Sequence, residues 1–261
     1  MTDTLPTPFD VKLMNMAASV LFMAFAVMML AAGIWWALRN PMFAISGITV
    51  QGDVAHNNAV TLRANVAPRL AGNFFTVNLR AARSAFEAVP WVRHSVVRRE
   101  FPNRLRVILE EHQPVAYWGT GGESQLVNSF GEVFEANAGD VEDDDLPHLS
   151  GPSGQAPQVL AMYRLLKPLF EPMDATLDGL ELSGRGSWRA QLDSGAVIEL
   201  GRGTGDEIAA RAQRFVRTLD QVTSKYGRRA DAVELADLRY GEGYALRLRG
   251  VTTVSADAKK K

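Results

Sequence analysis

The chain has 261 residues, and its 28 Lys and Arg against 29 Asp and Glu give a formal net charge of −1. This balance argues against a nucleic-acid-binding protein, which needs a clustered basic surface. The absence of cysteine excludes disulfides, thiolate nucleophiles and cysteine-ligated metal sites.

An uncharged apolar run extends from Leu13 to Leu38. As a helix rising about 1.5 Å per residue it would be roughly 39 Å long, enough to cross a hydrocarbon core of about 30 Å. A cleaved signal peptide is the main alternative, but its apolar region would be only about 7–15 residues long. We therefore predict a tail at residues 1–12 and an uncleaved transmembrane helix at residues 13–38, with the Trp35–Trp36 pair near the headgroups.

Residues 43–112 have the pattern of a small α+β domain. The alternation around Leu105, Val107 and Leu109 is typical of a half-buried strand. Pro90 ends one helical pattern, and Asn57 or Asn58 can cap another. The predicted order is β-α-α-β-β, one sheet covered by two helices. The expected elements are a strand at 43–51, helices at 57–70 and 80–88, and strands at 92–99 and 104–109.

Residues 113–250 predict a second domain, a mainly antiparallel sheet with two helices. Turn residues separate short apolar runs, and two longer runs have helical spacing. A polar tail at 251–261 is typical of a disordered terminus. The expected elements are a hairpin at 125–134, an acidic loop at 140–145, a helix at 159–170, strands at 177–183, 188–192 and 196–200, a helix at 208–222, and a hairpin at 233–249 around Gly241-Glu242-Gly243.

A glycine-rich segment, residues 201–205, precedes the second of these helices. Its spacing is not that of a dinucleotide fingerprint, and the lysine of a P-loop is missing. Asp206 and Glu207 suit the positive end of the helix but would repel a phosphate. The segment therefore predicts a turn and helix cap. The histidines do not have metal-ligand spacing either, so no catalytic, cofactor or metal site is expected.

Arginines cluster on two adjacent strands of the first domain. Two interpretations stay open for this basic zone: an ordinary solvated sheet face, or a docking surface for an acidic partner or phospholipid headgroups. The zone consists of Arg93, Arg98, Arg99, Arg104 and Arg106.

Taken in order, a set of short segments resembles the FtsQ/DivIB family of bacterial cell-division proteins over nearly the whole chain. Each segment alone is common, but the ordered set is specific. The segments are Ile48–Gly52, Gly72–Leu79, Val89–Val92, Val96–Leu105, Glu110–Trp118, Asp178–Leu180, Ser187–Trp188, Leu200–Gly203 and Asp237–Tyr240.

The resemblance implies a POTRA domain at 43–112 and an FtsQ-type β-domain at 113–250. It implies a single-pass protein of the bacterial inner membrane, concentrated at the division septum, with a cytoplasmic N-terminus and a periplasmic body. The implied role is an essential, non-enzymatic divisome scaffold that links early and late division proteins and helps to control septal peptidoglycan synthesis. The implied partners are FtsB and FtsL, with FtsK, FtsW and FtsI; no cofactor, nucleic acid or small-molecule substrate is implied.

The resemblance also assigns two partner-binding sites. The strand after Pro90-Trp91-Val92 would meet other division proteins. Glu242 departs from the small polar residue expected at its turn. The positions implied for FtsB are Arg185, Arg239, Tyr240, Glu242 and Gly243, and those implied on the POTRA strand are His94, Val97 and Arg99.

Two other functions compete with the scaffold. A POTRA-type polypeptide-binding chaperone of the envelope would need tandem POTRA units and a barrel partner, whereas this sequence shows one unit. A periplasmic envelope enzyme would need a nucleophile or metal constellation. The sequence favours the scaffold.

Overall fold

A computed structural model gives the fold of the chain. It describes residues 8–52, 55–56, 62, 64, 66–120, 125–137, 139, 141, 145–241 and 243–251. The chain folds as two compact units, Met1–Glu111 and His112–Lys261.

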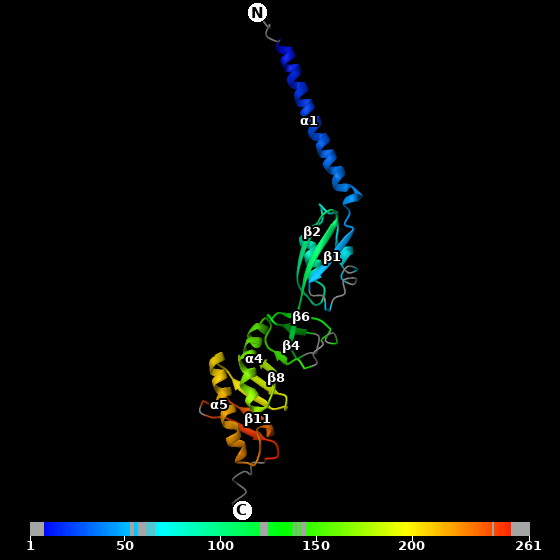
Figure 1. Cartoon of the computed structure of the whole chain (residues 1–261). Helices are drawn as coiled ribbons and strands as arrows, with labels where there is room; N and C mark the ends of the chain where they lie inside the picture. Colours follow the sequence, from blue (N-terminus) through cyan, green and yellow to red (C-terminus); the bar gives the residue numbers. More distant parts are fainter. Residues whose placement is uncertain are drawn as a thin grey trace, which may run out of the picture. The chain divides into compact units, whose positions relative to one another are not determined.

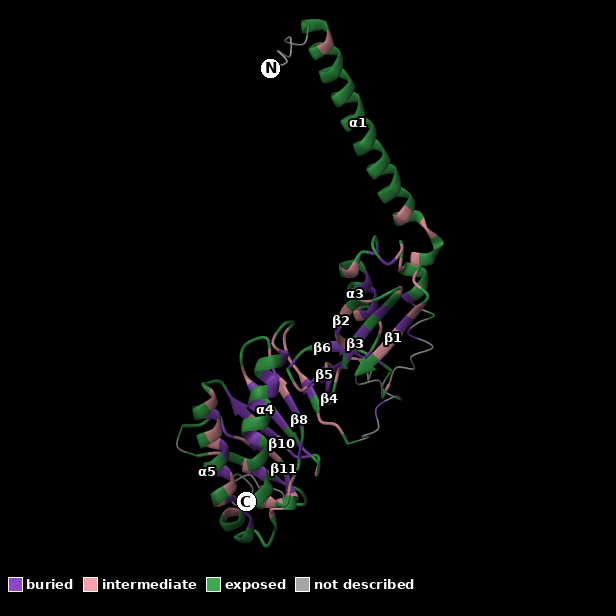
Figure 2. Ribbon diagram, turned by 45° about the horizontal axis from the view of Figure 1, so that its top comes forward, coloured by how far each residue is buried: buried purple, intermediate pink, exposed green. Residues whose placement is uncertain are grey.

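The first unit begins with a long apolar helix, α1 (Phe9–Arg39), coloured blue in Figure 1. It has 31 residues and none of them is buried, as its colouring in Figure 2 shows. A helix that is apolar on every side and uncovered by protein suits a lipid environment. The described residues thus contain a helix long and apolar enough to cross a membrane, where the sequence predicts one at 13–38.

A three-stranded sheet follows α1, with the order β1-β3-β2. The strands are β1 (Gly47–Gly52), β2 (Val92–Glu100) and β3 (Arg104–Glu111). β1 runs parallel to β3, and β2 runs antiparallel to it. Alternate residues of β3 are buried, which confirms the alternation predicted for that strand.

Helix α3 (Leu79–Glu87) packs on β2. It begins where the side chain of Asn78 accepts hydrogen bonds from the backbone N–H groups of Arg80 and Ala81. Its apolar face supplies Phe86 to a core that also contains Ile48 and Val107.

In this unit, the predicted start of the first strand is wrong, and the first helix predicted after α1 is only partly described by the structure. The strand predicted at 43–51 begins only at Gly47, because Pro41–Phe43 form a 3₁₀ turn, η1, capped by the Asn40 side chain. Half of the residues of the helix predicted at 57–70 lie outside the described residues, while Leu62, Ala64 and Val66 are helical. Near its predicted end, Ala67–Arg69 form a 3₁₀ turn, η2.

The second unit is built on a nine-stranded sheet with the order β12-β11-β10-β9-β8-β7-β4-β5-β6. Its first strands in the chain are β4 (Pro114–Trp118), β5 (Gln125–Asn128), β6 (Val133–Glu135) and β7 (His148–Ser150). The later strands are β8 (Leu177–Leu182), β9 (Trp188–Leu192), β10 (Val197–Gly201), β11 (Val233–Asp237) and β12 (Ala245–Leu248).

Two helices, α4 (Ala156–Phe170) and α5 (Gly205–Ser224), pack against each other and against this sheet (Figure 1). Short 3₁₀ turns follow them, η4 (Glu171–Met173) and η5 (Ala230–Ala232). Their inner faces, including Leu166 of α4 and Phe215 of α5, meet the buried strand residues Trp188 and Ile198 in one core.

The sheet is mainly antiparallel, as predicted, but three pairings are parallel: β10 with β11, β7 with β8, and β4 with β7. Parallel neighbours need a long crossover. Helix α4 lies in the crossover from β7 to β8, and α5 lies in that from β10 to β11. The strands β4 and β7 were not predicted.

The start of α5 confirms the predicted helix cap. The Thr204 hydroxyl accepts a hydrogen bond from the Glu207 N–H, and the Glu207 carboxylate accepts one from the Thr204 N–H at 2.8 Å. This capping box uses the groups that a phosphate would need.

The final hairpin differs from the prediction. β11 ends at Asp237 and β12 begins at Ala245, so the described residues 238–241 and 243–244 lie outside both strands, and the connection is longer than Gly241-Glu242-Gly243.

Candidate partner-binding edge

β12 is the terminal strand on one side of the sheet and pairs with β11. The N–H of Arg249 donates to the carbonyl of Ala232 at 2.8 Å, so it points toward the β11 side. The direction of N–H groups alternates along a strand, and the N–H groups of Leu246 and Leu248 therefore point away from β11. An extended segment of another chain can use such outward groups.

The loop before β12 is held in place from two elements. The Leu238 N–H donates to the carbonyl of Glu199 on β10 at 2.8 Å. From α5, the Arg214 guanidinium donates to the Gly241 carbonyl at 2.8 Å, and Thr218 and Tyr244 share a hydrogen bond of 2.8 Å between their hydroxyls. These contacts fix Leu238, Gly241 and Tyr244 to the body of the second unit.

Tyr240 and Arg239 lie on this loop but differ in their surroundings. The Tyr240 side chain is 59% exposed. The Arg239 guanidinium donates two hydrogen bonds to the Asp237 carboxylate, at 2.8 and 2.6 Å. These hydrogen bonds lower the pKa of Asp237 and raise that of Arg239. Arg239 is thus already paired within its own chain.

A glycine makes room for the Arg239 side chain. Gly201, the last residue of β10, has a φ of +79°, and a Cβ there would lie 2.9 Å from the Cγ of Arg239. A larger residue would be strained by its backbone and would also displace the arginine. This close approach explains why β10 ends in glycine.

Arg185 is exposed on the turn between β8 and β9. The pairing of Gly201 with Trp188, and of Glu199 with Asp237, places that turn at the same end of the sheet as Arg239 and Tyr240. β9 and β11 flank β10, so these strands lie roughly 10 Å apart. Glu242 lies outside the described residues, and Gly243 lines a groove beside β12.

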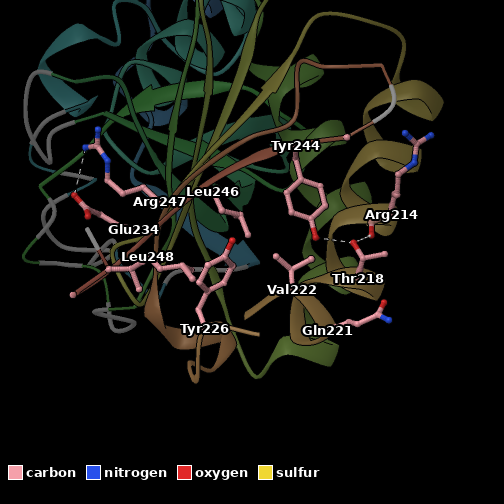
Figure 3. Close-up of a pocket in the computed structure, with 13 residues that line it drawn as sticks. Arg214, Thr218, Gln221, Val222, Tyr226, Glu234, Tyr244, Leu246, Arg247 and Leu248 are labelled. Carbon is pink, nitrogen blue, oxygen red and sulfur yellow. Dashed lines mark hydrogen bonds and ion pairs between the residues drawn. The ribbon is translucent and has the colours of Figure 1, made fainter. Parts of the chain in front are cut away.

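The groove separates the last strand from the C-terminal half of α5 (Figure 3). Its volume is about 880 Å³. Val222 and Tyr226 line it from the helix side, and Tyr244, Leu246 and Leu248 line it from the strand side. Polar side chains, among them Gln221 and Arg247, lie around it.

Sequence reasoning missed the groove. The alternation of Tyr244, Leu246 and Leu248 and the spacing of Val222 and Tyr226 by one helical turn were both visible. Both patterns, however, are equally typical of ordinary core residues. That all of them except the buried Leu248 are at least partly exposed became evident only from the packing.

The predicted POTRA positions on β2 make contacts inside their own domain. Arg99 donates to the backbone carbonyls of Phe74 at 2.6 Å, Phe75 at 3.3 Å and Val77 at 2.9 Å. Val97 is half-buried and packs against the domain core. The His94 ring lies 3.0 Å from Arg83 and 3.3 Å from the Glu87 carboxylate.

Ion pairs with glutamates neutralise part of the positive charge of the basic zone. Arg93 pairs with Glu110 at 2.7 Å, and Arg106 pairs with Glu100. Together with the contacts of Arg99, these pairs favour a solvated sheet face for most of the zone. Arg98 and Arg104 are exposed.

Comparison with known proteins finds two family matches that together cover most of the chain. Residues 43–112 match the POTRA domain of FtsQ type, and residues 116–239 match the C-terminal domain of the cell-division protein FtsQ/DivIB.

Whole-length relatives agree with these matches. The chain is 43% identical to the cell-division protein FtsQ of Burkholderia pseudomallei, over 97% of this chain and 98% of that protein. It is 39% identical to the FtsQ of Thiomonas arsenitoxydans, over 94% and 89% of the two chains. It is 40% identical to the FtsQ of Bordetella pertussis, over 92% of each.

Proposed function

Since the chain belongs to the FtsQ/DivIB family of cell-division proteins, we propose that it is a non-enzymatic divisome scaffold that receives a strand of FtsB along β12. The observation that carries the proposal is the side of β12 with which no other strand of the described residues pairs, where Leu246 and Leu248 direct backbone N–H groups away from β11. The chain is a single-pass protein of the inner membrane, with α1 as its membrane span.

Strand addition needs selectivity, because backbone hydrogen bonds alone would accept any extended segment. The groove between α5 and β12 supports the proposal here, since alternate apolar side chains of an added strand could enter it. Tyr240 offers an exposed aromatic ring at the end of the strand, of the kind that dominates interface energetics.

Charge supplies the second element of selectivity. Arg185 is exposed at the same end of the sheet and can pair with an acidic group of FtsB. Arg239 would first have to share or exchange its hydrogen bonds with Asp237. We therefore expect Arg185 to contribute more to partner recognition than Arg239.

The remaining parts of the proposal concern the assembled machinery. The body would lie in the periplasm and the N-terminus in the cytoplasm, with the protein concentrated at the septum. FtsL would join through FtsB, and FtsK, FtsW and FtsI would be further partners that bring the scaffold to septal peptidoglycan synthesis. The binding of these further partners at the POTRA strand β2 is supported by His94 and Val97, because both residues are partly exposed.

Substitution of Tyr240 tests the site. Tyr240→Ala should weaken FtsB binding by about 2 kcal/mol or more, roughly thirtyfold, because truncating an interface aromatic removes a central apolar contact. The full chain in lipid nanodiscs would be titrated with a soluble FtsB fragment.

Arg239→Ala serves as the matched control on the neighbouring residue, and its effect should be much smaller because its guanidinium already pairs with Asp237. Circular dichroism would establish that both variants are folded. Wild-type affinity in folded Tyr240→Ala protein would remove this residue from the proposed site.

A further inference from the structure

Four phenylalanines meet at one end of the first unit. The rings of Phe43 and Phe75 are 4.9 Å apart, those of Phe74 and Phe75 are 5.2 Å apart, and those of Phe74 and Phe101 are 6.3 Å apart, all edge-to-face. We call them the phenylalanine cluster. Phe74 is buried, but Phe75 is 47% exposed and Phe101 is 79% exposed. An exposed apolar group of this kind marks an interaction surface.

The strand topology places this cluster where the chain enters the domain from α1. β1 and β3 start at the same end of the sheet, since Gly47 pairs with Arg104 in parallel. The turn between β2 and β3, which carries Phe101, joins that end through a hydrogen bond of 2.9 Å from the Ser46 N–H to the Asn103 carbonyl. Only residues 40–46 separate α1 from β1.

Direct contacts hold the cluster at the level of the last turn of α1. The Asn73 side-chain amide donates to the carbonyl of Leu38, one of the carbonyls that a helix end leaves without an intrahelical partner. The Phe74 N–H donates to the Phe43 carbonyl at 2.8 Å. The loop that carries Phe74 and Phe75 is therefore fixed to the end of the membrane helix.

Hydrogen bonds hold the backbone of this loop, so the fold itself keeps the Phe75 side chain exposed. The Asn73 side chain accepts hydrogen bonds from the N–H groups of Phe75 and Thr76, both at 3.0 Å. From the neighbouring strand, Arg99 donates to the carbonyls of Phe74 and Phe75. These contacts explain why Arg99 turns toward its own domain.

The length of α1 sets the depth of its end. Its 31 residues extend about 46 Å, close to the 40–45 Å of a bilayer with its headgroups. Trp35 has the Arg39 guanidinium 4.3 Å from its ring centroid, a pairing suited to the boundary between lipid and water. Residues fixed to the end of α1 therefore lie at headgroup depth.

We propose that the exposed side chains of Phe75 and Phe101, with Met42, insert into the headgroup region of the membrane that α1 spans. Met42 follows α1 directly and is 71% exposed. Apolar side chains of interfacial segments enter lipid to about 5–10 Å. The exposed cation of Arg104 at the same end favours anionic phospholipids. The contact would fix the tilt of the POTRA domain on the membrane surface.

The absence of cysteine makes the proposal directly testable, because one introduced thiol can carry a spin label. The full Phe101→Cys chain would be labelled with a nitroxide and reconstituted into vesicles of phosphatidylethanolamine and phosphatidylglycerol. Oxygen should relax this label more effectively than a water-soluble nickel chelate does. A label at Glu110→Cys, exposed near the other end of β3, should show the reverse order.

A second substitution tests the cluster as a unit. Phe75→Ser should shift the label at residue 101 toward the nickel chelate. Phe130→Ser, which removes an exposed ring in the second unit, should leave it unchanged. Should circular dichroism show that Phe101→Cys disturbs the fold, a label at Met42→Cys gives the same comparison.

The vesicles contain only this chain and lipid, so no other division protein can produce the expected signal. Equal, water-like accessibility at residues 101 and 110 would overturn the proposal. So would a lipid-like signal that arises only after another division protein is added, which would identify the cluster as a protein-binding surface.

Discussion

At the scale of single residues, the Arg239 side chain is held by Asp237, the last residue of β11. Its guanidinium lies against the Asp237 carboxylate, while the adjacent Tyr240 ring faces solvent. Sequence reasoning assigned both residues to one interface. The structure separates them, because an arginine that is already paired gains less from a partner's carboxylate than an unpaired one.

The pair predicts a change in the titration of Asp237. In Arg239→Ala, the pKa of Asp237 should rise toward its ordinary range, because the hydrogen bonds that stabilise the carboxylate are lost. Carboxyl-carbon chemical shifts in an NMR acid titration would report it. Arg247→Ala is the matched control, since Arg247 lies 3.8 Å from Glu234 and should leave Asp237 unaffected.

The sign of the stability effect follows from the lowered pKa. A carboxyl whose folded-state pKa is depressed stabilises the fold above its ordinary pKa, and this contribution is lost as pH falls through the lowered value. Arg239→Ala should therefore be less stable than the wild type at neutral pH, and the difference should vanish in strong acid. An unchanged Asp237 titration would show that the pair does not persist in solution.

At the scale of elements, β12 combines an open backbone side with side chains that line a groove. The direction of its N–H groups follows from the hydrogen bond between Arg249 and Ala232. Because Leu246 points its N–H away from β11, removing that N–H should spare the β11–β12 ladder.

Leu246→Pro separates the backbone contribution from the side-chain contribution. It should weaken FtsB binding by about 1 kcal/mol or more, at least about fivefold, because the partner loses one backbone donor. Leu246→Ala keeps the N–H and tests the groove contact alone. Binding by the same titration, with thermal unfolding as a check of the fold, would give both values. Equal affinity of the proline variant and the wild type would exclude pairing along this edge.

At the scale of the whole molecule, helix α1 separates the tail at residues 1–8 from the folded body that follows it. The proposed topology predicts that a single cysteine at Ser224, which is exposed at the end of α5, reacts with an impermeant thiol reagent in intact spheroplasts. A cysteine at Thr4 in the tail should react only after lysis. Labelling in the opposite order would reverse the orientation.

Local signals made much of the fold readable from the sequence. The apolar run of α1, the alternation in β3 and the Thr204–Glu207 cap all depend on residues within a few positions of one another. The hairpin at 233–249 was predicted for the same reason, although its loop is wider than its glycines indicated.

Contacts between distant segments could be decided only by the tertiary structure. The parallel pairing of β10 with β11 leaves β12 at the edge, and α5 must then pack beside it to form the groove. Likewise, Arg99 reaches the carbonyls of the Phe74–Val77 loop, and Asn73 reaches the end of α1. The sequence by itself determined the membrane helix, most element types and the family, because periodicity, capping and ordered motifs are written along the chain. The position of the last strand at a sheet edge, predicted because its hairpin ends the domain, is confirmed. The groove beside that edge, and which arginines are already bound, depend on long-range packing that no local pattern specifies.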